Sequence, residues 1–312
     1  MREKRDYMTK SKGWDWENVN ENYRATHLKP TEDSHNCAVT WKESGYKSVL
    51  DLGAGLGRHS ICFAKNGFDV TAIEISEYGV KHLQDWATAE NVEIAATVGD
   101  MLSLPYANNS FDCIFAYHVI SHSDTIGMKK IIAEIERVLK PNGAIYLSFS
   151  SKATTDFIEK TQPMVDENTL FWVGGADIDG SPIFYASERD IMELLANFTI
   201  HKIFQREFYF SNEDGGDKKA EYHYVSATKT NHHKERIMKS QSTNLTFDDA
   251  ACKGCLLCVA ACPPKILELD LTRVNAKGYN PVACTDLAKC TACAICARIC
   301  PDSVIKVERG DA

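Results

Sequence analysis

The chain has 312 residues, of which 44% are hydrophobic, so its length predicts about two domains and its composition is sufficient for packed cores. A formal net charge of -8 and a pI near 5.7 argue against a nucleic-acid-binding surface, which requires a basic face. The charged N-terminus lacks the apolar stretch of a signal peptide and no run approaches the ~20 apolar residues of a membrane span, so we expect a cytoplasmic protein that binds neither nucleic acid nor membrane.

Residues 1–45 are polar apart from their tryptophans, and their pattern predicts a helix from about Glu32 to Ser44. From Lys47 onward, short apolar runs alternate with segments of helical period. The runs span 48–52, 69–73, 92–98, 111–118 and 144–149. This alternation predicts βαβ units, and hence an α/β fold with a doubly wound, mostly parallel sheet covered on both faces. Ligands of such sheets bind beyond the carboxyl ends of the strands.

The helix before the last of these runs is the clearest, because six apolar residues between Met128 and Leu139 share one stripe and Pro141-Asn142-Gly143 follows. After Ser150, about 35 residues have little regular pattern. A capped helix is then predicted from Ser187, with Asp190 three residues on, and further apolar runs lie near 199–207 and 222–227.

A glycine-rich turn follows the first run. Gly53, Ala54 and Gly55 carry so little side chain that a ligand can lie against their backbone N–H groups, at the positive end of the helix that follows. Two familiar glycine loops do not fit, because Arg58 stands where both the dinucleotide fingerprint and the P-loop require glycine.

The spacing Asp51-x-Gly53-x-Gly55-x-Gly57 resembles motif I of the class I S-adenosylmethionine (SAM) methyltransferases. With Glu74, Gly99-Asp100-Met101 and the segment 139–143, the set resembles motifs I to V of small-molecule members of that family, over about residues 30–230. Arg58-His59-Ser60 and the segment Ile183–Glu188 are similar to the tellurite-resistance branch. The resemblance implies the Rossmann-like sheet of class I methyltransferases, closed by an antiparallel hairpin made of the last two apolar runs.

The same resemblance implies roles for residues at the strand ends. Glu74 would accept both ribose hydroxyls, Asp100 would accept from the adenine amino group, and Met101 would pack on the adenine ring. A strand-end glutamate and a turn-forming aspartate are the ordinary alternatives for the first two. The full set of expected SAM-binding residues is Asp51, Gly53, Ala54, Gly55, Gly57, Arg58, Glu74, Ile75, Asp100 and Met101.

The reaction implied is in-line transfer of the sulfonium methyl group to a small-molecule acceptor that the sequence does not name. Catalysis of this kind rests mainly on positioning, and a base is optional. Tyr117 and His118 end the fourth run at the mouth of the expected cleft. His118 and the nearby His122 are the base candidates by their titration range. Their alternative role is ordinary packing or hydrogen bonding.

Nine of the twelve cysteines lie between Cys252 and Cys300, and such clustering in a chain without a secretion signal indicates metal rather than disulfides. Cys252-x2-Cys255-x2-Cys258-x3-Cys262-Pro263 is repeated at an offset of 38 as Cys290-x2-Cys293-x2-Cys296-x3-Cys300-Pro301. The offset also aligns apolar runs after each motif, so we infer a duplicated half.

This part resembles bacterial two-cluster ferredoxins over about residues 246–310, which implies a small α+β ferredoxin-like domain. In that family the fourth ligand of each cluster comes from the other half. One [4Fe-4S] cluster would then be bound by Cys252, Cys255, Cys258 and Cys300. The second would be bound by Cys290, Cys293, Cys296 and Cys262. Zinc is the alternative metal, and Cys284 belongs to neither set.

Residues Asn275–Pro281 are similar to delta-type ferredoxin subunits of 2-oxoacid:ferredoxin oxidoreductases, which leaves open docking on a redox protein partner. The cysteine spacing does not match the Cys-x3-Cys-x2-Cys motif of radical SAM enzymes. The predicted order is an N-terminal helical segment (1–45), a SAM-dependent methyltransferase domain (46–228), a linker (229–245) and a two-cluster ferredoxin domain (246–312). The resemblance implies that the N-terminal segment is a lid over the cofactor cleft, and a plain packing helix is the alternative. The alternative to a methyltransferase fused to an electron-transfer module is a ferredoxin-type electron-carrier subunit whose first domain only binds a ligand.

Overall fold

The computed structural model describes residues 13–17, 19, 21–174, 180–211, 217–230, 243–290 and 292–309. The chain divides into two compact units, Met1–Thr230 and Asn231–Ala312, and each is described by itself. Most of the expected linker lies outside the described residues.

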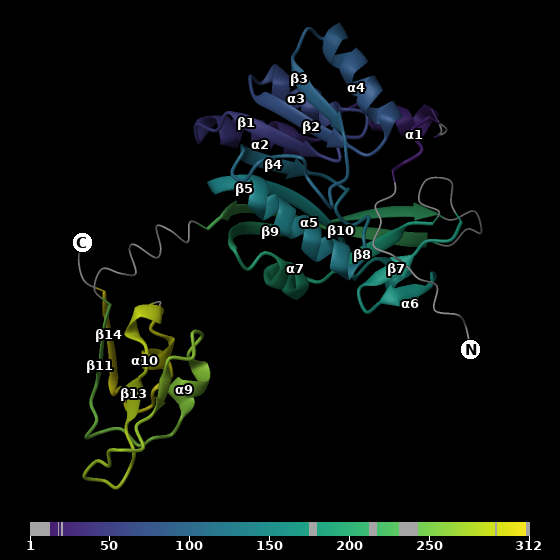
Figure 1. The fold of residues 1–312 in the computed structure, drawn as a ribbon. Coiled ribbons are helices and arrows are strands. Elements are labelled where there is room, and N and C mark those ends of the chain that lie inside the picture. Colours follow the sequence, from purple (N-terminus) through teal and green to yellow (C-terminus); the bar gives the residue numbers. More distant parts are fainter. Residues whose placement is uncertain are drawn as a thin grey trace. The chain divides into compact units, whose positions relative to one another are not determined.

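The first unit is built on a mixed sheet whose parallel half has the order β3-β2-β1-β4-β5 (Figure 1). The strands of this half are β1 (Ser48–Leu52), β2 (Asp69–Glu74), β3 (Ile94–Val98), β4 (Phe111–Ala116) and β5 (Leu139–Ser151). The order reverses between β1 and β4, as a doubly wound sheet requires, so the carboxyl ends of these two strands frame a ligand site. The predicted α/β class is confirmed.

The strands after β5 enlarge the sheet. These strands are β6 (Met164–Asp166), β7 (Thr169–Phe171), β8 (Pro182–Ala186), β9 (Phe198–Ser211) and β10 (Asp217–Lys229). β10 runs antiparallel to β5 and forms the expected hairpin with β9. β8 pairs with β5 only at its end, from Ser150, whereas β4 stops pairing at Leu147. On this side of β5, a short gap without strand pairing therefore separates the end of β4 from β8. Residues 117–122, which follow β4, lie at this gap.

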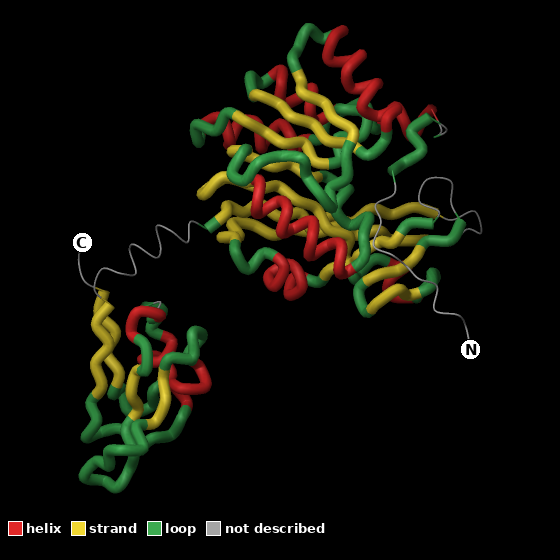
Figure 2. The backbone as a smooth tube through the Cα atoms, in the orientation of Figure 1, coloured by secondary structure: helices red, strands yellow, loops and turns green. Residues whose placement is uncertain are grey.

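Helices cover both faces of the sheet (Figure 2). The described helices of this unit are α1 (Glu21–Thr26), α2 (Glu32–Glu43), α3 (Arg58–Lys65), α4 (Glu77–Ala89), α5 (Thr125–Val138), α6 (Thr155–Glu159) and α7 (Glu188–Leu194). Side chains alternate along each strand, so β1 sends Leu50 and Leu52 into a core with α5, and Val49 into a second core with α2 and α3.

The amphipathic stripe of α5 is buried as predicted, with Met128, Ile131 and Ile135 fully inaccessible to solvent. Each such side chain contributes about 1.5–3 kcal/mol of transfer free energy. The N-cap Asp124 accepts from the backbone N–H of Gly127, and α7 begins with the expected capping box of Ser187 and Asp190.

Some boundaries differ from those expected. β5 begins at Leu139 rather than near residue 144, because Leu139 pairs with Phe111 ahead of an irregularity between Phe111 and Cys113. α6, β6 and β7 lie in the stretch where the sequence shows little pattern. Strands of three residues and one helical turn are too short to produce a recognisable period.

The second unit consists of two similar halves. Its elements are β11 (Thr243–Phe247), α9 (Leu257–Ala261), β12 (Leu267–Leu269), β13 (Val282–Cys284), the 3-10 turn η1 (Leu287–Lys289), α10 (Ile295–Ile299) and β14 (Ile305–Arg309). The strands pair across the halves, β11 with β14 and β12 with β13. Positive φ angles recur at the offset of 38, as at Leu256 and Ala294. The inferred duplication thus extends to the backbone conformation.

Candidate functional site: the cavity of the first unit and the cysteine sets of the second

The turn after β1 has no room for side chains. Gly53 and Gly55 have φ of 69° and 55°, a region in which side chains are strained. A Cβ on Gly53 would lie 2.2 Å from Cγ2 of Val119, and one on Gly55 would lie 3.0 Å from the ring of Trp16. The turn therefore presents bare backbone to the space beyond β1.

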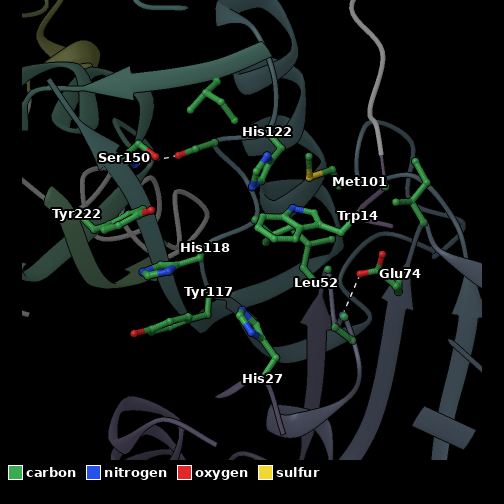
Figure 3. Close-up of a pocket in the computed structure, with 18 of the residues that line it drawn as sticks. Trp14, His27, Leu52, Glu74, Met101, Tyr117, His118, His122, Ser150 and Tyr222 are labelled. Atoms are coloured by element: carbon green, nitrogen blue, oxygen red, sulfur yellow. Dashed lines mark hydrogen bonds between the residues drawn. The ribbon is translucent and has the colours of Figure 1, made fainter. Parts of the chain in front are cut away.

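Two acidic side chains hold this turn from different sides. Asp51 is 1% exposed and accepts from the Ser60 hydroxyl at 2.5 Å, and its burial raises its pKa to about 6. Glu74 ends β2, and one of its carboxylate oxygens accepts from the backbone N–H of Gly55 at 2.9 Å (dashed line in Figure 3). The other oxygen accepts from the backbone N–H of Ser76 at 3.0 Å. Burial raises the pKa of Glu74 as well. Glu74 retains lone pairs for a further donor, because a carboxylate offers about four.

The turn opens into a cavity of about 360 Å3 at the carboxyl ends of the parallel strands. Leu52, Glu74 and Met101 lie at one end, and Tyr222 and Ser150 lie at the other (Figure 3). The cavity is therefore a single space with one end beside the glycine turn and a second end near the antiparallel strands.

The N-terminal segment forms part of the cavity wall. Trp14, Trp16 and His27 line it, and Trp14 stacks on Trp16 with ring centroids 5.6 Å apart. α2 instead packs its Trp41 against Phe63 of α3. Of the expected lid, the residues before α2 therefore contact the cavity, and the helix itself contributes to the core.

Three stacked rings occupy the end away from Glu74. His118 lies between Tyr117 (centroids 4.3 Å apart) and Tyr222 (4.0 Å), as Figure 3 shows. His122 stands edge-on to Trp14, 5.7 Å from its centroid. This end of the cavity combines aromatic surface with hydrogen-bonding groups, which suits a small polar ligand.

Both base candidates are neutral at neutral pH. Burial, reinforced by Arg58 and His122, lowers the pKa of His118 to about 3. Burial also lowers the pKa of His122 to about 4, against a backbone hydrogen bond to His118 that raises it. Each neutral imidazole consequently has one donor and one acceptor nitrogen.

Ten of the residues predicted for the site line the cavity: Gly53, Ala54, Gly55, Arg58, Glu74, Ile75, Met101, Tyr117, His118 and His122. Three others lie elsewhere. Asp51 is beneath the turn, and a Cβ on Gly57 would lie 2.3 Å from Leu83, so Gly57 permits close packing of α3 on α4. Asp100 accepts from the backbone N–H of Leu102 at 2.8 Å in its own turn.

Sequence reasoning missed other residues of the cavity wall, among them Tyr222, Ser150, Trp172 and His27. They come from β10, β5 and loops. A motif at fixed spacing cannot identify them, because their neighbours in the cavity are distant in sequence.

Cysteines from the two halves of the second unit lie near one another. Cys262, Cys290, Cys293 and Cys296 line one small pocket together. Burial raises the pKa of Cys258, and the neighbouring thiols of Cys255 and Cys300 raise it further. Five of the cluster cysteines are buried in the core of this unit (Cys252, Cys258, Cys262, Cys290 and Cys296).

No three His, Cys, Asp or Glu side chains converge to hold a single metal ion within the parts of the chain that the structure describes. A [4Fe-4S] cluster does not require such convergence, because its four thiolates bind four different irons. The described helices include none with the length and apolarity needed to cross a bilayer.

Comparison with known proteins identifies both units. Residues 50–147 match the family described as a methyltransferase domain, and residues 251–304 match the family described as a 4Fe-4S dicluster domain. Curated relatives include glycine/sarcosine/dimethylglycine N-methyltransferase of Actinopolyspora halophila, 32% identical over 45% of this chain and 24% of its own length. Norajmaline N-methyltransferase of Rauvolfia serpentina is 32% identical over 38% of this chain and 41% of its own length. The chain thus spans less than half the length of these relatives.

Solved structures share the fold of the first unit. A SAM-dependent methyltransferase from Methanosarcina mazei aligns with a TM-score of 0.51 and 20% identity, over 65% of this chain and 99% of the other. TehB from Haemophilus influenzae aligns with a TM-score of 0.51 and 18% identity, over 67% of this chain and 65% of the other. The chain therefore carries a methyltransferase domain with the Rossmann-like class I fold, followed by a 4Fe-4S dicluster domain.

Proposed function

We propose that the first unit transfers a methyl group from SAM to a small-molecule acceptor. The observation that carries this proposal is the single cavity that joins the side-chain-free turn and Glu74 at one end to the rings of Tyr117, His118 and Tyr222 at the other. Such a cavity can hold two reactants in contact while excluding most water.

The residues at the turn fit the adenosine and methionine parts of SAM. Glu74 has acceptor capacity left for ribose hydroxyls, and Met101 is buried at the wall where an adenine ring would pack. The indole Nε1 of Trp16 is buried without a hydrogen-bond partner in the structure, so it is a donor suited to a polar group of the cofactor. The adenine contact of Asp100 stays a prediction.

When bound, SAM supplies an electrophilic methyl group on a sulfonium sulfur. The chain's own residues then have to hold the acceptor in line with that methyl group and keep water out. The aromatic walls supply the apolar contact, and His118 and His122 supply the hydrogen bonds. Orientation alone is worth several kcal/mol of barrier in such reactions.

Isothermal titration with SAM tests the proposal. Gly55→Arg should abolish binding, because its side chain would fill the turn and meet Trp16. Gly45→Arg is the matched control, since Gly45 also has a positive φ (79°) but has nothing within 4 Å of its Cβ position. SAM binding that survives Gly55→Arg, in a protein whose circular dichroism is unchanged, would contradict the proposal.

We further propose that the second unit binds two [4Fe-4S] clusters through the two cross-half cysteine sets. The shared pocket of Cys262, Cys290, Cys293 and Cys296 supports one set, and the proximity of Cys258 to Cys255 and Cys300 supports the other. Anaerobic reconstitution should yield about eight irons per chain, half of them in each cluster. A mononuclear zinc protein would bind one or two metal ions and no sulfide.

A second candidate function is electron delivery to a redox protein partner. Its support is the exposure of Cys255 together with its neighbours Leu256 and Leu257, which are 49% and 47% exposed. Incubation of cell metabolites with labelled SAM under anaerobic conditions, with the clusters oxidised and then reduced, separates the functions. Labelled product in either state supports methyl transfer, whereas reduced clusters that pass electrons to a partner without any labelled product support the electron carrier.

A further inference from the structure

His118 is held in an unusual conformation immediately after β4. Its φ is 54°, which costs a non-glycine residue on the order of 1 kcal/mol or more. Its backbone N–H donates to the Ser148 hydroxyl at 2.6 Å. The faces of its ring are covered by Tyr117 and Tyr222, so a ligand in the cavity can meet this imidazole only at its edge.

One nitrogen of that edge is already engaged. Nε2 of His118 lies 2.7 Å from the hydroxyl of Tyr224, a residue with no solvent-exposed surface. Tyr224 is directly paired with Ser148 in the β10–β5 register. Adjacent strands therefore hold both the backbone and the ring of His118.

The direction of this hydrogen bond follows from acid strength. A phenol is a much stronger acid than a neutral imidazole N–H, and an imidazole nitrogen is a better acceptor than a phenol oxygen. Burial raises the pKa of Tyr224, which therefore keeps its proton. The Tyr117 hydroxyl, 3.4 Å from that of Tyr224, can donate to the phenol oxygen in turn. With Nε2 accepting, the proton of His118 resides on Nδ1.

His122 is a second neutral imidazole in the wall of the same cavity. It stands edge-on to Trp14, and burial lowers its pKa to about 4. One of its ring nitrogens therefore carries a proton and the other keeps a lone pair. The cavity is thus lined by one imidazole fixed as a donor and by a second imidazole that retains an acceptor nitrogen.

We propose that Tyr224 is a positioning residue that fixes His118 as a hydrogen-bond donor toward the methyl acceptor, whereas His122 takes up the acceptor's proton. The inference rests on the proposed methyl transfer. It specifies an acceptor whose nucleophile bears a proton (S–H, N–H or O–H) beside an oxygen that accepts a hydrogen bond. Arg58, which also lines the cavity, favours an anionic oxygen such as a carboxylate.

The step balances as a displacement. The nucleophile's bond to hydrogen breaks and its proton moves to the lone pair of His122. The nucleophile's electron pair forms the bond to the methyl carbon, and the pair of the methyl–sulfur bond stays on sulfur. The products are the methylated acceptor, S-adenosylhomocysteine and a protonated His122, which returns its proton to water.

Histidine tautomers measured in the full chain test the inference. Long-range 15N–1H correlation spectra of protein labelled with 15N-histidine distinguish Nδ1–H from Nε2–H rings, and the His118 signal is the one lost in His118→Gln. We expect Nδ1–H as the majority form of His118 in the unaltered protein. Tyr224→Phe, which keeps the packed ring but removes the hydroxyl, should abolish that majority.

Tyr222→Phe is the matched control, because it removes a hydroxyl from the other ring stacked on His118 while keeping the stack. It should leave the tautomer unchanged. A majority of Nε2–H in the unaltered protein overturns the inference without any variant, and so does an Nδ1–H majority that persists in Tyr224→Phe. The measurement uses neither SAM nor acceptor, so its outcome is separate from the test of the proposed function.

Discussion

The indole ring of Trp16 lies against the backbone of Gly55, where any β-carbon would come within 3.0 Å of its Cζ2 atom. Arg24 fixes this segment by donating to the carbonyl oxygens of Trp16 (2.9 Å) and Glu17 (2.8 Å). A residue near the N-terminus therefore covers the glycine turn at Gly55.

Replacing Trp16 should weaken the cavity wall. Trp16 is only 7% exposed. Its replacement by alanine should weaken SAM binding about tenfold, equivalent to ~1.4 kcal/mol. Trp16→Phe should keep most of the packing but lose the Nε1 donor, so its effect on the dissociation constant separates ring contact from hydrogen bonding. Titration calorimetry gives both values, and equal affinity in all three proteins would show that Trp16 does not contact the ligand.

A coupling is expected between Gly53 and Val119. Gly53→Ala should destabilise the protein by about 2–3 kcal/mol, because the new methyl would lie 2.2 Å from Val119 Cγ2 at a positive φ. Gly45→Ala, at a similar φ but in open space, should cost only about 1 kcal/mol from strain. In urea denaturation, Val119→Ala should recover part of the Gly53→Ala loss; strictly additive effects would place the two residues out of contact.

Acid should destabilise the first unit through its buried histidines. The pKa of His122 falls from 6.5 to about 4 on folding, so the unfolded chain binds more protons between these values and stability decreases as the pH falls through this window. Above pH 6.5 the contribution of His122 to the free energy of unfolding is fully present, and it is on the order of 3 kcal/mol. Burial, with Arg58 and His122 nearby, also lowers the pKa of His118, so this residue adds to the same loss of stability in acid.

Asp51 acts in the opposite sense. Its pKa is raised to about 6, so its contribution favours the folded state at low pH and is lost as the pH rises through that value.

Urea denaturation of the unaltered protein and of His122→Asn at pH 7.5 and pH 5 isolates the contribution of His122. The variant should lose less stability than the unaltered protein on acidification, and an equal loss in both would refute the assignment.

Cysteine substitutions should pair across the two halves. If Cys300 completes the cluster of the first motif, Cys300→Ser should perturb the same cluster as Cys258→Ser. Likewise, Cys262→Ser and Cys296→Ser should both perturb the cluster of the second motif. Electron paramagnetic resonance of the reduced protein identifies which cluster signal changes in each variant.

Cys284→Ser is the control for the cluster variants. Cys284 ends β13, and burial raises the pKa of its thiol, with Cys290 and Cys262 nearby. Both cluster signals should persist in this variant. Loss of a cluster on substitution of Cys284, or grouping of Cys300 with Cys296, would require a different set of ligands.

The sequence by itself determined the elements whose signals are local. The stripe of α5, the capping box of Ser187 and Asp190, and the cysteine triplets all depend on spacing within a few turns or a short loop. The motif Asp51–Gly57 was recognised by spacing, yet the structure gives its members different tasks. Gly53 and Gly55 line the cavity, whereas Asp51 bonds to Ser60 of α3 and Gly57 lets α3 pack closely on α4.

Only the tertiary structure decided what faces the ligand from other elements. Tyr224 meets His118 across 106 positions of sequence, and it does so because β10 pairs with β5 in a register that sets Tyr224 opposite Ser148. A shift of one residue would turn Tyr224 to the other face of the sheet. Periodicity predicts that a strand exists, but its partner and register depend on the packing of the whole sheet. The hydrogen bonding at the end of the cavity that holds His118 depends on that register.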